Sequence, residues 1–279
     1  MALPKLPNDY PSEMYGVRVI PDYIERPGGQ PYIRFGSDVG LQALGAYVGT
    51  LHTTEGPYVS TGRATLGSKF AAATLCGPYS PADPAATIMP TRPPWAQHSA
   101  LRDEGLPFHP NGYGPQIEMV ERTRASLWTP MAPTLLATAA YMAWCAEVYE
   151  IPPESCWPGD PDGRPAEAEI ARRKSKPPTK GGWTDHLFWG DGNDHGDCGG
   201  LRRSVLFKAA EEVLDVVDPR VEKFVLGLLD KLGDKDDPDK DASAAGAANR
   251  VAKAVRDHEK AGQTEPGEVA DHEHGGVKR

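Results

Sequence analysis

Apolar residues between positions 130 and 149 recur at steps of three and four residues. The positions with this spacing are Leu135, Ala139, Met142, Ala143 and Ala146. Side chains at such steps lie along one face of an α-helix. Thr129 is a suitable N-cap residue, and Ile151-Pro152-Pro153 cannot continue the helical pattern. We therefore predict a helix over about residues 130–149 that buries one face.

Two further helical patterns follow. The first covers about residues 203–217 and places Leu206, Ala209, Ala210, Val213 and Val217 on one side. Pro219 interrupts the pattern, and a second one covers residues 220–232 up to Gly233. We predict two helices here, which together form a helical extension over residues 203–232.

Short apolar stretches of strand length occur at residues 46–51, 70–75, 86–89 and 115–120. The Ala-rich members of this set are also compatible with a helix, because short apolar runs are ambiguous. Residues 1–43 are rich in Pro, Gly and Tyr and show no helical period, which indicates an irregular arm or short edge strands. Strands mixed with long helices predict an α/β fold rather than a sandwich of two sheets.

The last part of the chain differs in composition from the rest. Residues 233–279 contain no Phe, Trp, Tyr, Leu or Ile, and their only large aliphatic residues are four valines. A segment with so little apolar surface cannot offset the entropy lost on ordering. We expect a charged, disordered tail over residues 233–279, with at most a transient helix over residues 242–260.

Composition and charge narrow the function classes. The formal net charge of -9 argues against a protein that binds the phosphate backbone of nucleic acids. No run of 18 or more apolar residues is present, so we expect no membrane span. The first residues, Met1-Ala2-Leu3-Pro4-Lys5, lack the apolar core of a secretory signal, and we expect no signal peptide. We therefore expect the four cysteines to be reduced structural thiols.

Three features are candidates for chemistry. His52 lies at the end of a predicted strand, followed by Thr53-Thr54-Glu55-Gly56, and is either a hydrogen-bonded structural residue or a ligand held on a rigid element. Residues 183–200 gather two histidines, several aspartates and Cys198, a donor set that suits zinc, or else form a Gly-rich surface loop. Glu118 lies inside an apolar strand and either faces outward or is held in a site. Burial raises the pKa of a carboxyl group, which suits a general base.

The chain order of these features resembles the zinc-dependent N-acetylmuramoyl-L-alanine amidases, whose fold is shared by bacteriophage endolysins and peptidoglycan recognition proteins. The resemblance is carried by His-Thr-Thr-Glu-Gly at 52–56, Gln-Ile-Glu at 116–118, Asp-His-Gly-Asp at 194–197, Trp128 and the Ala-rich helix that ends in Tyr149-Glu150-Ile151-Pro152. Within this family, the chain most resembles the endolysins of phages that infect actinobacteria. The resemblance covers residues 44–202. The resemblance implies a catalytic domain of that extent, with a central mixed β-sheet flanked by helices.

Carried over by position, the resemblance implies that His52, His186 and Asp197 are zinc ligands. It implies that Glu118 activates the water on the metal and that His195 steadies the oxyanion. The chain departs from the family after Asp197, where Cys198-Gly199-Gly200 stands in place of Pro-Gly. Cys198 is therefore an alternative third ligand, but only the register with Asp197 places His195 in the oxyanion position.

The resemblance implies a peptidoglycan hydrolase that cleaves the amide bond between N-acetylmuramic acid and L-alanine. Trp95, Trp183 and Trp189 are expected to be exposed candidates for lining a substrate groove, with packing aromatics as the alternative. Trp95-Ala96-Gln97-His98 matches the family's Trp-His-Ala segment only loosely, so His98 is not counted among the ligands. The partner implied is a holin, which would release the enzyme from the host cytoplasm to the wall. The alternatives are a non-catalytic peptidoglycan-binding module on the same fold and a virion structural protein.

Overall fold

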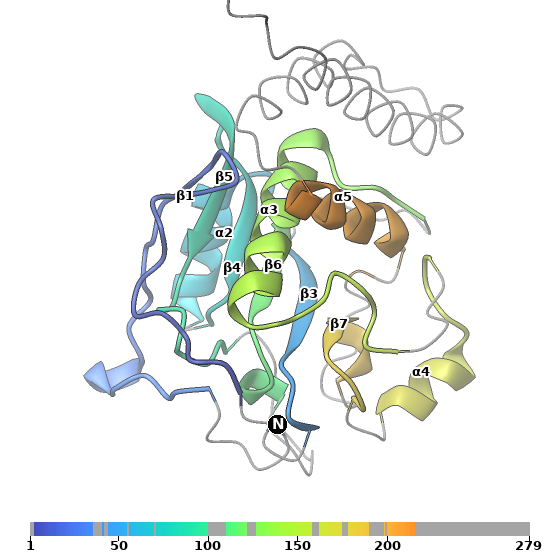
Figure 1. Ribbon diagram of the computed structural model, residues 1–279. Coiled ribbons are helices and arrows are strands. Elements are labelled where there is room, and N and C mark those ends of the chain that lie inside the picture. Colours follow the sequence, from blue (N-terminus) through green and yellow to red (C-terminus); the bar gives the residue numbers. More distant parts are fainter. Residues whose placement is uncertain are drawn as a thin grey trace, which may run out of the picture.

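A mixed seven-stranded sheet runs through the protein (Figure 1), in the order β1-β2-β5-β4-β6-β3-β7. The neighbours β1 and β2, and β4 and β5, are antiparallel, and the other neighbours are parallel. The strands are β1 (Glu13–Met14), β2 (Val17–Val19), β3 (Val48–Thr54), β4 (Thr74–Ser80), β5 (Asp83–Pro90), β6 (Gln116–Val120) and β7 (Gly182–Asp185). The prediction of an α/β fold with a central mixed sheet is confirmed.

This computed structural model describes residues 3–35, 41, 44–54, 56–69, 71–99, 110–121, 127–157, 162–174, 178–189, 198 and 200–215. The α-helices are α2 (Val59–Ser68), α3 (Ala132–Val148), α4 (Glu167–Lys174) and α5 (Arg203–Asp215), and the 3-10 helices are η1 (Pro27–Gly29), η2 (Pro110–Gly112) and η3 (His186–Phe188). None of the helices in these ranges is long and apolar enough to cross a membrane. The predicted helices at 220–232 and 242–260 lie outside them.

Helices cover both faces of the sheet (Figure 1). Leu51 of β3 and Ile117 and Met119 of β6 pack into one core with α3 and α5. Val59 and Leu66 of α2 pack on the opposite face, in a separate core. Because successive side chains of a strand point to opposite faces, the residues next to Leu51, Ile117 and Met119 in the two strands face away from α3. These neighbouring residues include His52, Gln116 and Glu118.

The first turn of α3 is held by the side chain of Glu121, which directly follows β6, and not by an N-cap side chain of the helix itself. The predicted cap Thr129 is wrong, because Met131 is the N-cap residue and makes no side-chain cap. Instead the carboxylate of Glu121 accepts the backbone N–H of Met131, at 3.1 and 3.0 Å from its two oxygens. Burial raises the pKa of Glu121 to about 7, although this hydrogen bond opposes the shift.

Segments on either side of the predicted catalytic domain join the same fold. The predicted arm contributes β1 and β2 at one edge of the sheet, where β2 pairs with β5. From the predicted extension, α5 buries Leu206 and Ala210 completely in the core that contains α3. The domain boundaries at residues 43, 202 and 232 stay predictions.

Candidate functional site

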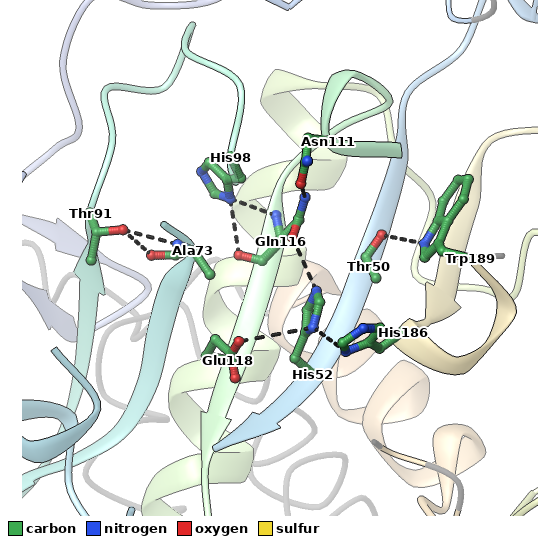
Figure 2. Close-up of polar contacts among 10 residues, drawn as sticks. All are labelled: Thr50, His52, Ala73, Thr91, His98, Asn111, Gln116, Glu118, His186 and Trp189. Atoms are coloured by element: carbon green, nitrogen blue, oxygen red, sulfur yellow. Dashed lines mark hydrogen bonds and ion pairs between the residues drawn. The ribbon is translucent and has the colours of Figure 1, made fainter. Parts of the chain in front are cut away.

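The parallel strands β3 and β6 bring His52 and Glu118 together (Figure 2). The two residues are directly paired in the register of the strands. His52 Nδ1 lies 3.9 Å from Glu118 Oε1, and the two side chains are 1% and 10% exposed. Both therefore leave the sheet on the same face, in surroundings that largely exclude bulk water. A carboxylate and an imidazole placed in this way can both contact one small molecule and exchange a proton with it.

His186 reaches the same place from a third element. It is the first residue of η3, directly after β7, and β7 pairs with β3. Its Nδ1 lies 3.1 Å from His52 Nδ1, and the centroids of the two rings are 4.6 Å apart (Figure 2). His186 is only 5% exposed. The structure thus joins two predicted ligands that lie 134 positions apart in the chain.

The other ring nitrogen of His52 contacts Gln116, which the sequence marks only as part of the Gln-Ile-Glu motif. His52 Nε2 lies 3.1 Å from Oε1 of Gln116, whose own Nε2 donates to Asn111 Oδ1 at 2.8 Å (Figure 2). Gln116 precedes Glu118 by two positions, so the alternation of strand β6 places both side chains on the same face. That alternation was the signal that could have marked Gln116 as a site residue.

His98 supports the backbone beside this cluster. The ring is 1% exposed, and its Nδ1 accepts the backbone N–H of Gln116 at 2.8 Å. Burial lowers the pKa of His98 to about 3, and the nearby charge of Arg92 acts in the same direction. A ring with so low a pKa is neutral at physiological pH and can keep accepting this hydrogen bond. His98 therefore helps to hold the part of β6 that carries Gln116 and Glu118.

Buried arginines hold the segment that carries His186. Nη2 of Arg203, at the start of α5, lies 2.7 Å from Oδ2 of Asp185, with side-chain exposures of 2% and 0%. Nη1 of Arg203 also donates to the carbonyl oxygen of Gly163 at 2.9 Å. On the other side, the guanidinium of Arg173 lies 4.6 Å from the ring centroid of Phe188, the last residue of η3. The position of His186 therefore depends on residues from both α4 and α5.

The expectation that Trp183 and Trp189 are exposed is wrong. Trp183 is fully buried and its ring lies across Gly49 of β3, so close that a Cβ added to Gly49 would be 2.3 Å from the ring. Trp189 is 1% exposed, and its indole N–H donates to Thr50 Oγ1 at 3.0 Å (Figure 2). Both rings are part of the core around β3 and β7, so neither offers a face on which a substrate can stack.

Trp95 has a different environment. Its ring is half-buried, with the guanidinium of Arg34 at 4.4 Å from the ring centroid and the ring of Tyr32 at 6.0 Å. The segment around Trp95 pairs with the N-terminal arm, because the N–H of Phe35 donates to the carbonyl oxygen of Trp95 at 3.0 Å. The role of Trp95 in substrate binding stays a prediction.

His195 and Asp197 lie outside the described residues, so the roles predicted for them stay predictions. Cys198 is described, and it is 2% exposed within the core that contains α3. In the part of the chain that the structure describes, no three His, Cys, Asp or Glu side chains form a group that could hold a metal ion. Cys198 therefore does not complete a ligand set with His52 and His186. Asp197, the other candidate for the third ligand, stays a prediction.

Comparisons with known proteins give little further guidance. No family model matches the chain, and no curated protein matches it. Among solved structures, the chain is similar to the Staphylococcus aureus hydrolase AmiA in complex with its ligand. The TM-score is 0.45 and the sequence identity 12%, over 71% of this chain and 83% of that chain. A likeness this distant carries no functional conclusion, so the function has to be inferred from the site itself.

Proposed function

We propose that this protein is a zinc-dependent N-acetylmuramoyl-L-alanine amidase that cleaves the bond between N-acetylmuramic acid and L-alanine in peptidoglycan. The observation that supports this most is the convergence of His52, His186 and Glu118 at one buried point. Two imidazole nitrogens that face each other, with a carboxylate beside them, are typical of catalytic zinc sites and unusual in a hydrophobic core. The three residues also hold the positions that the family resemblance assigns to two ligands and the general base.

The geometry of the two histidines is compatible with zinc. Zinc–nitrogen bonds of about 2.05 Å at a tetrahedral angle separate two ligand nitrogens by about 3.3 Å. The Nδ1 atoms of His52 and His186 are 3.1 Å apart. The measured separation thus differs from the separation in a zinc site by only a few tenths of an ångström. We propose that His52 and His186 hold the metal through Nδ1 and that Asp197 supplies the third ligand.

The chemistry proposed for Glu118 follows from its place beside the two histidines. When bound, zinc lowers the pKa of a water molecule and polarises the carbonyl oxygen of the substrate. Glu118 accepts the proton that this water loses and later returns it to the leaving nitrogen of L-alanine. Its position on a central strand, directly paired with His52, holds the carboxylate beside that ring.

His195 is proposed to donate a hydrogen bond to the oxyanion of the tetrahedral intermediate, a contribution of about 3 kcal/mol for a preorganised donor. As a phage lytic enzyme, the protein would act after a holin has opened the host membrane. Peptidoglycan is the proposed substrate, and the proposed site of action is the cell wall. A virion structural role would instead require incorporation of the chain into phage particles.

Digestion of purified cell walls tests the proposal. Mass spectrometry of the fragments should show newly freed N-terminal L-alanine, which a muramidase or an endopeptidase would not release. A chelator should abolish the release, and added zinc should restore it. If the pure protein contains no zinc and chelation leaves wall lysis unchanged, the proposed mechanism is wrong.

Glu118→Ala separates catalysis from binding. Loss of a general base should lower turnover by about 10²–10⁴-fold while binding of muropeptides persists. Glu211→Ala, the same substitution at an exposed position of α5, is the matched control and should leave turnover unchanged. Binding without turnover in the unmodified protein would instead favour the non-catalytic peptidoglycan-binding module.

A further inference from the structure

A chain of buried amides leads to the first histidine of the site. Asn111 is 8% exposed, Gln116 is fully buried and His52 is 1% exposed. Gln116 Nε2 donates to Asn111 Oδ1 at 2.8 Å, and Gln116 Oε1 lies 3.1 Å from His52 Nε2 (Figure 2). Buried amides need hydrogen-bond partners, so the hydrogen bonds that they make constrain the groups they contact.

The direction of these hydrogen bonds determines where the proton of His52 lies. An amide oxygen can only accept, so the 3.1 Å contact with Gln116 Oε1 requires the proton to be on Nε2 of His52. A neutral imidazole carries one N–H, which leaves a lone pair on Nδ1. Nδ1 is the atom that faces His186 Nδ1 at 3.1 Å. The amide chain thus directs the lone pair of His52 toward the second histidine.

Gln116 itself is held in place on both sides. Its backbone N–H donates to His98 Nδ1 at 2.8 Å, and its position on β6 is paired with Thr50 of β3. Its side-chain nitrogen is engaged by Asn111 on η2. Turning the amide around would place an N–H against a protonated His52 Nε2, or require the ring to change tautomer. The backbone support and the Asn111 contact together define one arrangement.

We propose that Gln116 is a positioning residue that fixes His52 in its Nε2–H tautomer, with the Nδ1 lone pair presented to a metal ion. Asn111 acts through Gln116 by orienting its amide. This inference rests on the proposed zinc function for its consequence, but the tautomer itself is a property of the metal-free protein. The opposite tautomer would place a proton on His52 Nδ1, the proposed ligating atom, and that proton would have to move before metal could bind. In the proposed tautomer, the N–H of the 3.1 Å contact between the two rings belongs to His186 instead, and His186 Nδ1 is the atom that loses a proton when metal binds.

Long-range ¹H–¹⁵N NMR of the imidazole rings in the metal-free protein measures the tautomer directly. In the unmodified protein, His52 should show a protonated Nε2 and an unprotonated Nδ1. In Gln116→Leu this pattern should give way to a mixture of tautomers, and zinc affinity, measured by competition with a chromophoric chelator, should fall about 10–100-fold. Gln30→Leu, the same substitution at an exposed position, should change neither.

Two more variants keep the test decisive if Gln116→Leu folds poorly. Gln116→Glu retains an oxygen acceptor and should preserve the Nε2–H tautomer, whereas Asn111→Ala should weaken it without touching His52. An Nδ1–H tautomer in the unmodified protein would overturn the proposal, as would unchanged tautomer and zinc affinity in Gln116→Leu. If the tautomer behaves as expected but the unmodified protein binds no zinc, Gln116 keeps its positioning role and the proposed metal function is refuted.

Discussion

Replacing Arg203 by Met tests whether the first residue of α5 supports the segment that carries His186. Arg203 is 2% exposed and lies 2.7 Å from the fully buried carboxylate of Asp185. Methionine retains most of the aliphatic volume of arginine but removes its charge. The variant therefore leaves Asp185 buried beside His186 without this cation.

The expected cost is large because the buried carboxylate of Asp185 has lost the cation beside it in an environment that water does not reach. Breaking a buried ion pair from one side typically costs about 3–5 kcal/mol. The hydrogen bond from Arg203 Nη1 to Gly163, at 2.9 Å, is lost as well and contributes to the upper part of this range. For a protein of this size, such a loss lowers the melting temperature by about 6–20 °C.

Urea unfolding followed by circular dichroism measures the change. Lys208→Met is the control on the same helix, because the side chain of Lys208 is 40% exposed and its ion pair with Glu212 is 3.8 Å long. That variant should stay within about 0.5 kcal/mol of the unmodified protein. Adding Asp185→Asn to Arg203→Met should recover part of the lost stability, because the uncompensated charge is then gone.

Two results would refute this reasoning. One is a loss of less than about 1 kcal/mol in Arg203→Met at an unchanged denaturant slope, which would mean that Asp185 is well satisfied without Arg203. The other is a double variant that is as unstable as the sum of its two single variants, because a shared charge pair cannot give additive effects.

Gly49→Ala should destabilise the protein by about 1–3 kcal/mol in the same unfolding assay. The reason is that the new Cβ would lie 2.3 Å from the buried Trp183 ring. A neutral effect would show that the ring can move aside. Burial raises the pKa of Glu121 from 4.5 to about 7. Between these pH values the folded state keeps a proton that the unfolded state releases. The free energy of unfolding therefore falls as the pH rises through this window. Glu121→Gln keeps an oxygen acceptor for the N–H of Met131, and it should flatten this fall by about 3 kcal/mol. An unchanged pH profile would contradict this expectation.

The secondary structure was predictable where apolar periodicity is strong. The helix expected over residues 130–149 corresponds to α3, and the strands expected at 46–51 and 86–89 correspond to β3 and β5. α2 was missed because its sequence includes Gly62 and Gly67, which weaken a helical pattern. Gly62 is required by packing, since a Cβ there would lie 2.7 Å from Leu75 of β4.

The site was partly predictable for a different reason. His52 and Glu118 stand out as polar residues in apolar strands, and both lie at the buried point that the structure describes. Trp183 was misplaced because the sequence around it is rich in Gly and Asp, which suggested a surface loop. That ring is instead buried against a glycine on the neighbouring strand, a pairing that no local pattern reveals.

The sequence by itself determined which residues can share a face, because the alternation of a strand and the period of a helix are local properties. His52 points away from the face of Leu51, and Glu118 away from the faces of Ile117 and Met119, for this reason alone. Only the tertiary structure decided that β3 lies between β6 and β7, which brings His186 to His52 and Gln116 to the far side of the same ring. Strand order depends on how all the helices and strands bury their apolar faces together, and that competition is settled by the whole chain.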